Sequence, residues 1–145
     1  MKTEYEEAIA RVLGGYPDLT TFGFGVYDGR WKTEEQRAAE LQAGREDFMT
    51  DRVREQFERA VEFLSQIEPR ATINFQIGSS YGLKHRCEAW HRRRRPDSDP
   101  YVPNGVFIAA AAHLGFRVYR SRDPYHPNAA FNFSSRSLSR LRSEA

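Results

Sequence analysis

A run of four arginines at positions 92–95, directly after His91, is the strongest chemical feature of the sequence. Adjacent guanidinium groups repel one another, and an anion that lies against them lowers this repulsion. The run also falls at the predicted end of a helix, where the helix dipole favours positive charge. Because the planar guanidinium fork matches phosphate and carboxylate groups, the run predicts an anionic partner.

Other basic and aromatic side chains of the second half could extend this run into one surface. Stacking rings beside a basic groove are what single-stranded or irregular nucleic acid requires, so we predict a nucleic-acid interface without metal or cofactor. The predicted phosphate contacts are Lys84, Arg86, Arg92, Arg93, Arg94, Arg95, Arg117, Arg120 and Arg122. The predicted stacking side chains are Tyr81, Trp90, Tyr101 and Tyr119. Arginines of the tail could join them: Arg136, Arg140 and Arg142.

Two other interpretations of the same residues stay open. The arginines could dock on an acidic protein surface, in which case the chain is a protein-binding inhibitor or adaptor. They could also form a solvated run without a specific partner, with the aromatic rings in the core. In the inhibitor hypothesis, the acidic helix expected at 33–67 could instead imitate the charge of nucleic acid toward another protein.

The distribution of charge separates the two halves of the chain. The 145 residues hold 22 Lys or Arg and 20 Asp or Glu, which gives a formal net charge of +2. Residues 1–68 carry 9 basic and 15 acidic side chains, whereas residues 69–145 carry 13 basic and 5 acidic ones. The corresponding net charges of −6 and +8 indicate an anionic partner or two halves that attract each other.

No residue pattern identifies an enzyme, so a binding protein with no catalytic residue is expected. Ser80 and Lys84 share a helix face, but the serine–lysine acylation motif places its lysine three residues after the serine. A structural zinc site needs four soft ligands in close pairs, and Cys87 is the sole cysteine. We therefore expect Cys87 to be a small buried side chain.

Two histidines are the remaining candidates for proton transfer. His85 lies between Lys84 and Arg86, whose positive charges disfavour its protonation. It could serve in proton transfer, but the spacing indicates no carboxylate partner for it. His113 lies on an otherwise apolar helix and is expected to be a hydrogen-bonded core residue rather than an acid or base.

Capping boxes predict the starts of two helices in the first half. The first box, at positions 3–6, predicts a short helix that ends at Gly14. The second, at positions 33–36, predicts a helical stretch to about residue 67, divided between residues 43 and 51 because Gly44 interrupts it. Its predicted buried stripe, at spacings of 4, 4, 3, 4 and 3, is Met49, Val53, Phe57, Ala60, Leu64 and Ile67.

The second half is predicted to hold a helix pair and a small antiparallel sheet. Residues 71–77 alternate well enough for a strand, and a helix follows to about His91. After an exposed loop, Asn104 is expected to cap an apolar helix that ends before Gly115. Strands at 116–120 and 129–133 form a plausible hairpin, and the tail from residue 134 forms a short basic helix or frays.

These elements predict a single α+β domain over residues 1–145, with an acidic helical part at 1–68 packed on a basic α+β part at 69–145. The order helix, helix, hairpin permits a winged-helix-like arrangement. Two observations oppose it. The loop between the helices has about a dozen residues, whereas a helix-turn-helix uses three or four. The second helix also lacks the polar surface that base reading needs.

Composition predicts a cytoplasmic protein that does not enter a membrane. The longest apolar run, at 106–112, is too short to span a bilayer. Three glutamates in the first dozen residues disfavour a secretory signal. A single cysteine excludes an internal disulfide and fits a reducing compartment.

Three short patterns carry a resemblance: SYGLKH at positions 80–85, YVPNGVFIAAA at 101–111, and GF at 115–116. In them the chain resembles a group of short uncharacterised bacterial proteins of plasmids, phages and other mobile elements. The resemblance covers roughly residues 71–133 and leaves the acidic half unmatched. It implies a mobile-element context and no defined activity. Small proteins of that origin include DNA-binding regulators and inhibitors of host defence systems.

Overall fold

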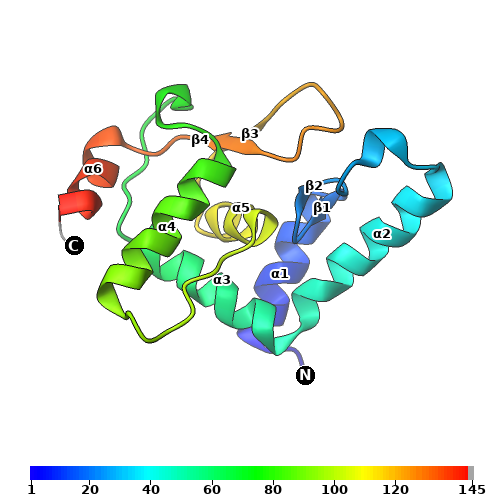
Figure 1. Cartoon of the computed structure of the whole chain (residues 1–145), viewed down its shortest axis with the longest axis horizontal. Coiled ribbons are helices and arrows are strands. Elements are labelled where there is room, and N and C mark those ends of the chain that lie inside the picture. Colours follow the sequence, from blue (N-terminus) through cyan, green and yellow to red (C-terminus); the bar gives the residue numbers. More distant parts are fainter. Residues whose placement is uncertain (144–145) are drawn as a thin grey trace.

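One apolar helix, α5 (Asn104–His113), runs through the middle of the fold, and three of the longer helices pack around it (Figure 1). This computed structural model describes residues 1–143. These residues form an α+β fold of six helices and two small two-stranded antiparallel sheets, as the sequence predicts. Every residue from the start of α5 to Ala111 is buried, because the helix presents small or apolar side chains on all sides.

The remaining elements among residues 1–143 are five helices and four short strands. The other helices are α1 (Glu4–Gly15), α2 (Glu34–Glu46), α3 (Asp51–Leu64), α4 (Ser80–Arg94) and α6 (Ser135–Ser143). Short strands β1 (Leu19–Thr20) and β2 (Gly23–Phe24) form one sheet, and β3 (Val118–Arg120) and β4 (Ala129–Phe131) form the other. Helix α2 extends to the right in Figure 1, whereas α6 lies at the opposite end of the molecule.

The predicted helix starts and the predicted division of the long helical stretch are confirmed. Thr3 accepts a hydrogen bond from the Glu6 amide, and Thr33 and Gln36 form a complete capping box. Helix α2 ends before Asp47, and α3 begins at Asp51. Gly44 lies inside α2 and packs closely against β1, since a Cβ there would lie 2.7 Å from the Cβ of Thr20. Its cost to the helix is therefore offset by a close contact with β1.

The predicted stripe on α3 is buried except for its first member. Met49 is more than half exposed, because it lies in the short 3-10 turn Asp47–Met49 that precedes the helix. Phe63, which the spacing did not include, is buried and packs against Phe107 of α5. Phe107 in turn packs against Phe131 and Phe133 at the hairpin. Residues of both halves therefore share one hydrophobic core.

Three sequence predictions about the second half are wrong in detail. Residues 71–77 form bends and a 3-10 turn instead of a strand, because the Asn74 side chain accepts from the Gln76 amide and donates to the Phe133 carbonyl. Helix α4 continues to Arg94, so three of the four adjacent arginines are helical. Asn104 does not cap α5: Pro103 holds that position, and the Asn104 amide donates to the Phe22 carbonyl.

The winged-helix-like arrangement is present only as an order of elements. Helix α5 is enclosed by α1, α3 and α4, so it has no free face that could enter a groove of DNA. At its start, a Cβ on Gly105 would lie 1.7 Å from the Thr20 carbonyl oxygen, so only glycine allows this approach. No helix among residues 1–143 is both long and apolar enough to cross a lipid bilayer.

Candidate nucleic-acid interface

Helix α4 positions most of the predicted site residues. Its inner face buries Leu83, Cys87 and Trp90 against the core, which fixes the rotation of the helix. Its outer face then presents residues such as His85 and Arg92 to solvent. This orientation is hard to predict from the sequence, because charged residues occur on both faces of the helix.

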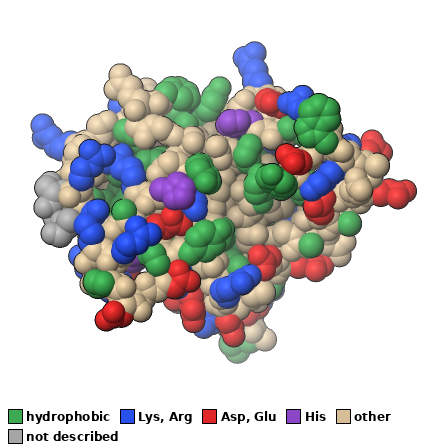
Figure 2. Space-filling model, viewed as in Figure 1, with side chains coloured by type: hydrophobic (Ala, Val, Ile, Leu, Met, Phe, Trp, Pro, Cys, Tyr) green, Lys and Arg blue, Asp and Glu red, His purple; other side chains and the backbone are tan. Residues whose placement is uncertain are grey.

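Arginines of α4 and α6 converge on one shallow pocket. Arg86, Arg93 and Arg142 line it, and its apolar floor is formed by Phe63, Trp90, Leu138 and Leu141. Arg94 lies over the Trp90 ring at 4.5 Å, and Arg92 is exposed on the same last turns of α4. We call this set the α4–α6 patch: Arg86, Arg92, Arg93, Arg94 and Arg142. Figure 2 shows Lys and Arg side chains gathered at this end of the molecule, with Asp and Glu mainly along its lower and right-hand edges.

None of the five guanidinium groups of the α4–α6 patch forms an ion pair among residues 1–143, although Arg94 lies close enough to Glu62 of α3 to help lower the pKa of that carboxyl. Burial, and then the positive charge of Arg142, lowers the pKa of Arg86 below its ordinary value. Two like charges therefore lie close enough to disfavour each other. An anion placed between them would relieve this repulsion.

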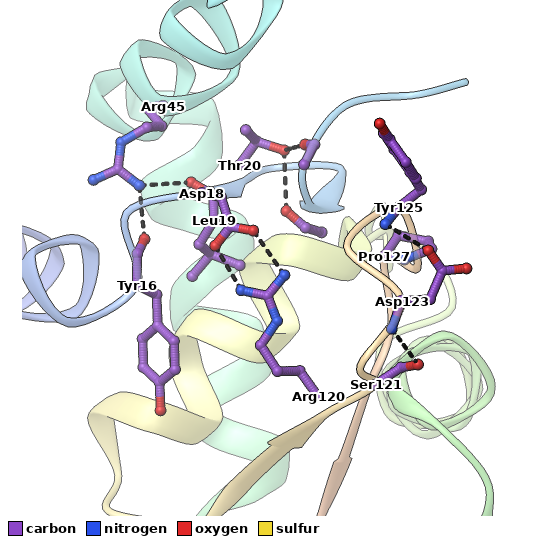
Figure 3. A network of polar contacts seen from close by, with 12 residues as sticks. Tyr16, Asp18, Leu19, Thr20, Arg45, Arg120, Ser121, Asp123, Tyr125 and Pro127 are labelled. Atoms are coloured by element: carbon purple, nitrogen blue, oxygen red, sulfur yellow. Dashed lines mark hydrogen bonds and ion pairs between the residues drawn. The ribbon is translucent and has the colours of Figure 1, made fainter. Parts of the chain in front are cut away.

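Three of the other predicted phosphate contacts are bound to groups of the protein itself. Arg95 forms two hydrogen bonds with Glu62 of α3, at 2.9 and 3.2 Å. Arg120 points from β3 to Asp18 and donates to both carboxylate oxygens at 2.7 Å (Figure 3). Arg117 donates to the Ala71 carbonyl, and Arg122 is exposed in the loop after β3. The structure therefore does not gather these four arginines into the α4–α6 patch.

Of the predicted stacking residues, one is buried in the core and three are exposed. Trp90 is 3% exposed and belongs to the core, so only the pocket side of its ring lies near the arginines. Tyr81, Tyr101 and Tyr119 are about half exposed, as a stacking role requires. Tyr119 packs edge-on against Phe75, 63% exposed, at 5.2 Å between ring centroids.

Phe75 and Tyr119 line a second pocket, at the start of α4. Its other lining residues include polar side chains that could bond the edge of a base: Ser79, Ser121, His126 and Asn128. The sequence did not indicate Phe75, because residues 71–77 were expected to form a strand. Its exposure results from the 3-10 turn that replaces that strand.

Lys84 is buried rather than exposed on the predicted surface. Its ammonium lies 3.0 Å from Glu88 Oε2, and both side chains are less than a tenth exposed. The same oxygen accepts from the Val102 amide at 3.0 Å, while Glu88 Oε1 lies 2.9 Å from His85 Nδ1. The rings of Tyr81 and Tyr101 face the ammonium at 5.4 and 4.7 Å. Glu88, three residues after His85, is thus the carboxylate partner that the sequence prediction missed.

The remaining cysteine and histidine candidates, Cys87, His91 and His113, do not form a catalytic or metal-binding site together. Cys87 is buried and unoxidised, as expected, and burial raises the pKa of its thiol. His113 is exposed beside Phe57 at the end of α5, so the prediction of a core histidine is wrong. His91 is buried against the Arg59 carbonyl, and burial lowers its pKa. Residues 1–143 contain no cluster of three or more His, Cys, Asp or Glu side chains that could hold a metal ion.

Comparisons of the chain with models of protein families, with curated proteins and with solved structures found no match. The candidate function therefore rests on the geometry and charge of the α4–α6 patch and on the exposed tyrosines near the start of α4.

Proposed function

We propose that the chain binds the phosphate backbone of single-stranded nucleic acid through the α4–α6 patch. The observation that carries this proposal is the convergence of Arg86, Arg93 and Arg142 on one pocket without a carboxylate among residues 1–143. Guanidinium groups in this arrangement bind phosphate oxygens through paired hydrogen bonds. Since solvent reaches the pocket, a backbone phosphate needs no rearrangement of the core to enter it.

The exposed tyrosines support a single strand over a duplex. Tyr81 lies on the outer face of α4, and Tyr101 lies close by in the loop that follows the helix. Unpaired bases can stack on such rings, whereas the bases of a duplex are already stacked on one another. The tyrosines and the arginines of α4 define a path along one helix, about 20 Å long for its 15 residues.

The direct test is binding of fluorescent single-stranded RNA, single-stranded DNA and duplex DNA, measured by anisotropy over a range of salt concentrations. Arg92→Ala/Arg93→Ala/Arg94→Ala should weaken binding to single strands. If all three groups contact phosphates, the slope of log affinity against log salt should fall by about two, because each contact contributes roughly 0.7.

A matched control removes the same charge elsewhere. Lys2→Ala/Arg11→Ala/Arg52→Ala changes exposed residues of the N-terminal segment, α1 and α3. This control should bind as the unmodified protein does. No binding at low salt, or equal loss in both triple variants, would remove the proposal.

A second candidate function is docking on another protein, and a different surface favours it. Trp31 is 81% exposed beside the start of α2, and Tyr27 and Phe22 nearby are also exposed and packed edge-on. Apolar rings beside an acidic helix are typical of protein contacts. If this surface acts, the chain should purify from its host with one stoichiometric protein, and Trp31→Ala should abolish that association.

The biological setting is part of the same proposal. We infer a bacterial mobile element, plasmid or phage as the source, on the resemblance of residues 71–133, and the reducing cytoplasm as the compartment, on the single cysteine. A regulator or an anti-defence inhibitor would each suit this setting. Binding to nucleic acid with no stoichiometric protein partner would favour the first.

A further inference from the structure

A half-exposed histidine held by a buried carboxylate lies on the outer face of α4. His85 Nδ1 is 2.9 Å from Glu88 Oε1, and the His85 side chain is 50% exposed. The other oxygen of Glu88 bonds Lys84 and the Val102 amide, so the carboxylate is fixed from two sides. Glu88 therefore holds the imidazole in one orientation.

The hydrogen bond assigns the tautomer of His85. Because a carboxylate accepts, Nδ1 donates and carries the proton of the neutral ring, which leaves the lone pair on Nε2. Among residues 1–143, no side chain or carbonyl bonds Nε2. A base whose far nitrogen is oriented by a carboxylate is the arrangement that general-base histidines use.

The same face of α4 brings the candidate base to the expected position of the phosphates. Arg92 follows His85 by seven residues, which places it two turns on, within about 20° on the helix face. Side chains of a helix lean toward its N-terminus, so the Arg92 guanidinium covers the turns between them. The ring of Tyr81 packs edge-on against His85 at 4.6 Å on the other side. A phosphodiester bound by Arg92 would therefore lie beside His85.

Two nearby nucleophiles of the protein, the Ser80 hydroxyl and the Cys87 thiol, are not available to such a phosphodiester. Ser80 is fully buried, and its hydroxyl accepts from the Ala129 amide. Cys87 is fully buried on the opposite face of α4. RNA, however, carries a nucleophile of its own in the 2′-hydroxyl next to each phosphate.

We propose that His85, positioned by Glu88, is the general base that cleaves single-stranded RNA bound along α4. His85 Nε2 takes the proton of the 2′-hydroxyl as the 2′-oxygen forms a bond to phosphorus. The bond from phosphorus to the 5′-oxygen breaks, and the leaving oxygen takes a proton from water. The products are a 2′,3′-cyclic phosphate and a 5′-hydroxyl. This inference rests on the proposed binding of single-stranded nucleic acid.

The test uses the full chain with a chelator present, single-stranded RNA, DNA of the same sequence, and RNA methylated at every 2′-oxygen. The protein should cleave the RNA to fragments ending in 2′,3′-cyclic phosphate, while binding the other two strands without cleavage. His85→Asn removes Nε2 but keeps an N–H that can face Glu88. Its cleavage rate should fall by about 10²–10⁴-fold with an unchanged Kd for the methylated RNA.

Glu88→Gln tests the positioning role. Because the amide cannot hold the imidazole as the carboxylate does, the maximal cleavage rate should fall while the Kd for methylated RNA stays the same. Loss of the charge beside Lys84 should lower the melting temperature in any case, so rate and Kd are measured well below it. Parallel losses of rate and affinity there would indicate a merely structural role. If Gln at this position unfolds the chain, His85→Asn alone decides.

The failures of the two proposals differ in outcome. Binding of RNA without cleavage overturns the role of His85 and leaves the proposed binding function standing. Failure to bind any of the three strands overturns the binding function itself. Equal cleavage by His85→Asn, or cleavage of DNA, overturns the inference, because neither result needs Nε2 and a 2′-hydroxyl.

Discussion

The arginines of the second half form two groups with different surroundings. Arg95 and Arg120 each bind both oxygens of a carboxylate from the first half, at Glu62 and Asp18. The α4–α6 patch has no such partner among residues 1–143. Part of the charge asymmetry between the halves is thus used internally, and the patch holds the part that remains. A net charge counted over a segment therefore overstates the charge offered to a partner.

Each group should respond to a different measurement. Charges with internal partners contribute to the free energy of unfolding, and their loss leaves a polar group without its bond. Charges without partners contribute little to stability but attract anions from solution. Substitutions at paired sites should therefore change the free energy of unfolding and leave the affinity for nucleic acid unchanged. Substitutions in the patch should change the affinity and leave the free energy of unfolding unchanged.

The largest effect is expected at the buried pair of Lys84 and Glu88. Glu88→Ala would leave the ammonium buried beside aromatic rings, so the free energy of unfolding should fall by about 3–5 kcal/mol in denaturant titrations. Lys84→Met/Glu88→Leu removes both charges and should recover much of this loss. A double variant as unstable as Glu88→Ala would mean that the lost packing, rather than the orphaned charge, explains the effect.

A smaller loss of stability is expected at Arg45 of α2. Its guanidinium donates to the carbonyl oxygens of Tyr16 and Leu19 (Figure 3). It also donates to the Leu13 carbonyl oxygen, so it ties α2 to the end of α1. Arg45→Ala should lower the free energy of unfolding by about 2 kcal/mol, because bonds to a charged donor are stronger than neutral ones. Its affinity for single strands should be unchanged, and a parallel fall in affinity would argue against two independent groups.

Local patterns predicted the helices of this fold well, and the contacts between distant residues account for the errors. Capping side chains and the spacing of apolar residues lie within a few positions, so the start of α2 and the stripe of α3 were visible in the sequence. The segment 71–77 was not, because its shape depends on bonds from Asn74 to residues about sixty positions away.

The candidate site shows the same division. The arginine run was evident from the sequence, but which arginines stay free depended on Glu62 and Asp18, more than thirty and a hundred positions away. Glu88 lies only three residues after His85, a spacing that matches one helix face. The sequence therefore contained this spacing. The burial of the Glu88 carboxylate, however, depends on how the whole chain packs.

Within the α4–α6 patch, a single substitution should separate binding from stability. Arg93→Ala should change the free energy of unfolding by no more than about 0.5 kcal/mol, because the side chain is exposed and has no ionic partner among residues 1–143. If Arg93 contacts one phosphate, the salt slope of single-strand affinity should fall by about 0.7. A clear loss of stability would show that Arg93 belongs with the internally paired arginines.

Glu62→Gln moves an arginine from one group to the other, and its effect on stability should also be small. The hydrogen bond from Arg95 holds the pKa of Glu62 below its ordinary value of 4.5. The carboxylate therefore stabilises the fold above that pH, and this contribution is lost as the pH falls through the lowered value. Because the pair is half exposed, the loss in Glu62→Gln should stay below about 1 kcal/mol at neutral pH and disappear in acid.

The same variant should bind single strands more tightly at low salt, because it removes one negative charge and releases Arg95 beside the patch. Arg95→Ala/Glu62→Gln provides the matched control, since it removes the same carboxylate without releasing a guanidinium. Tighter binding in Glu62→Gln but not in the double variant would show that an internal carboxylate limits the patch. Equal affinity in the two variants would mean that Arg95 lies outside the path of the strand, even when its partner is gone.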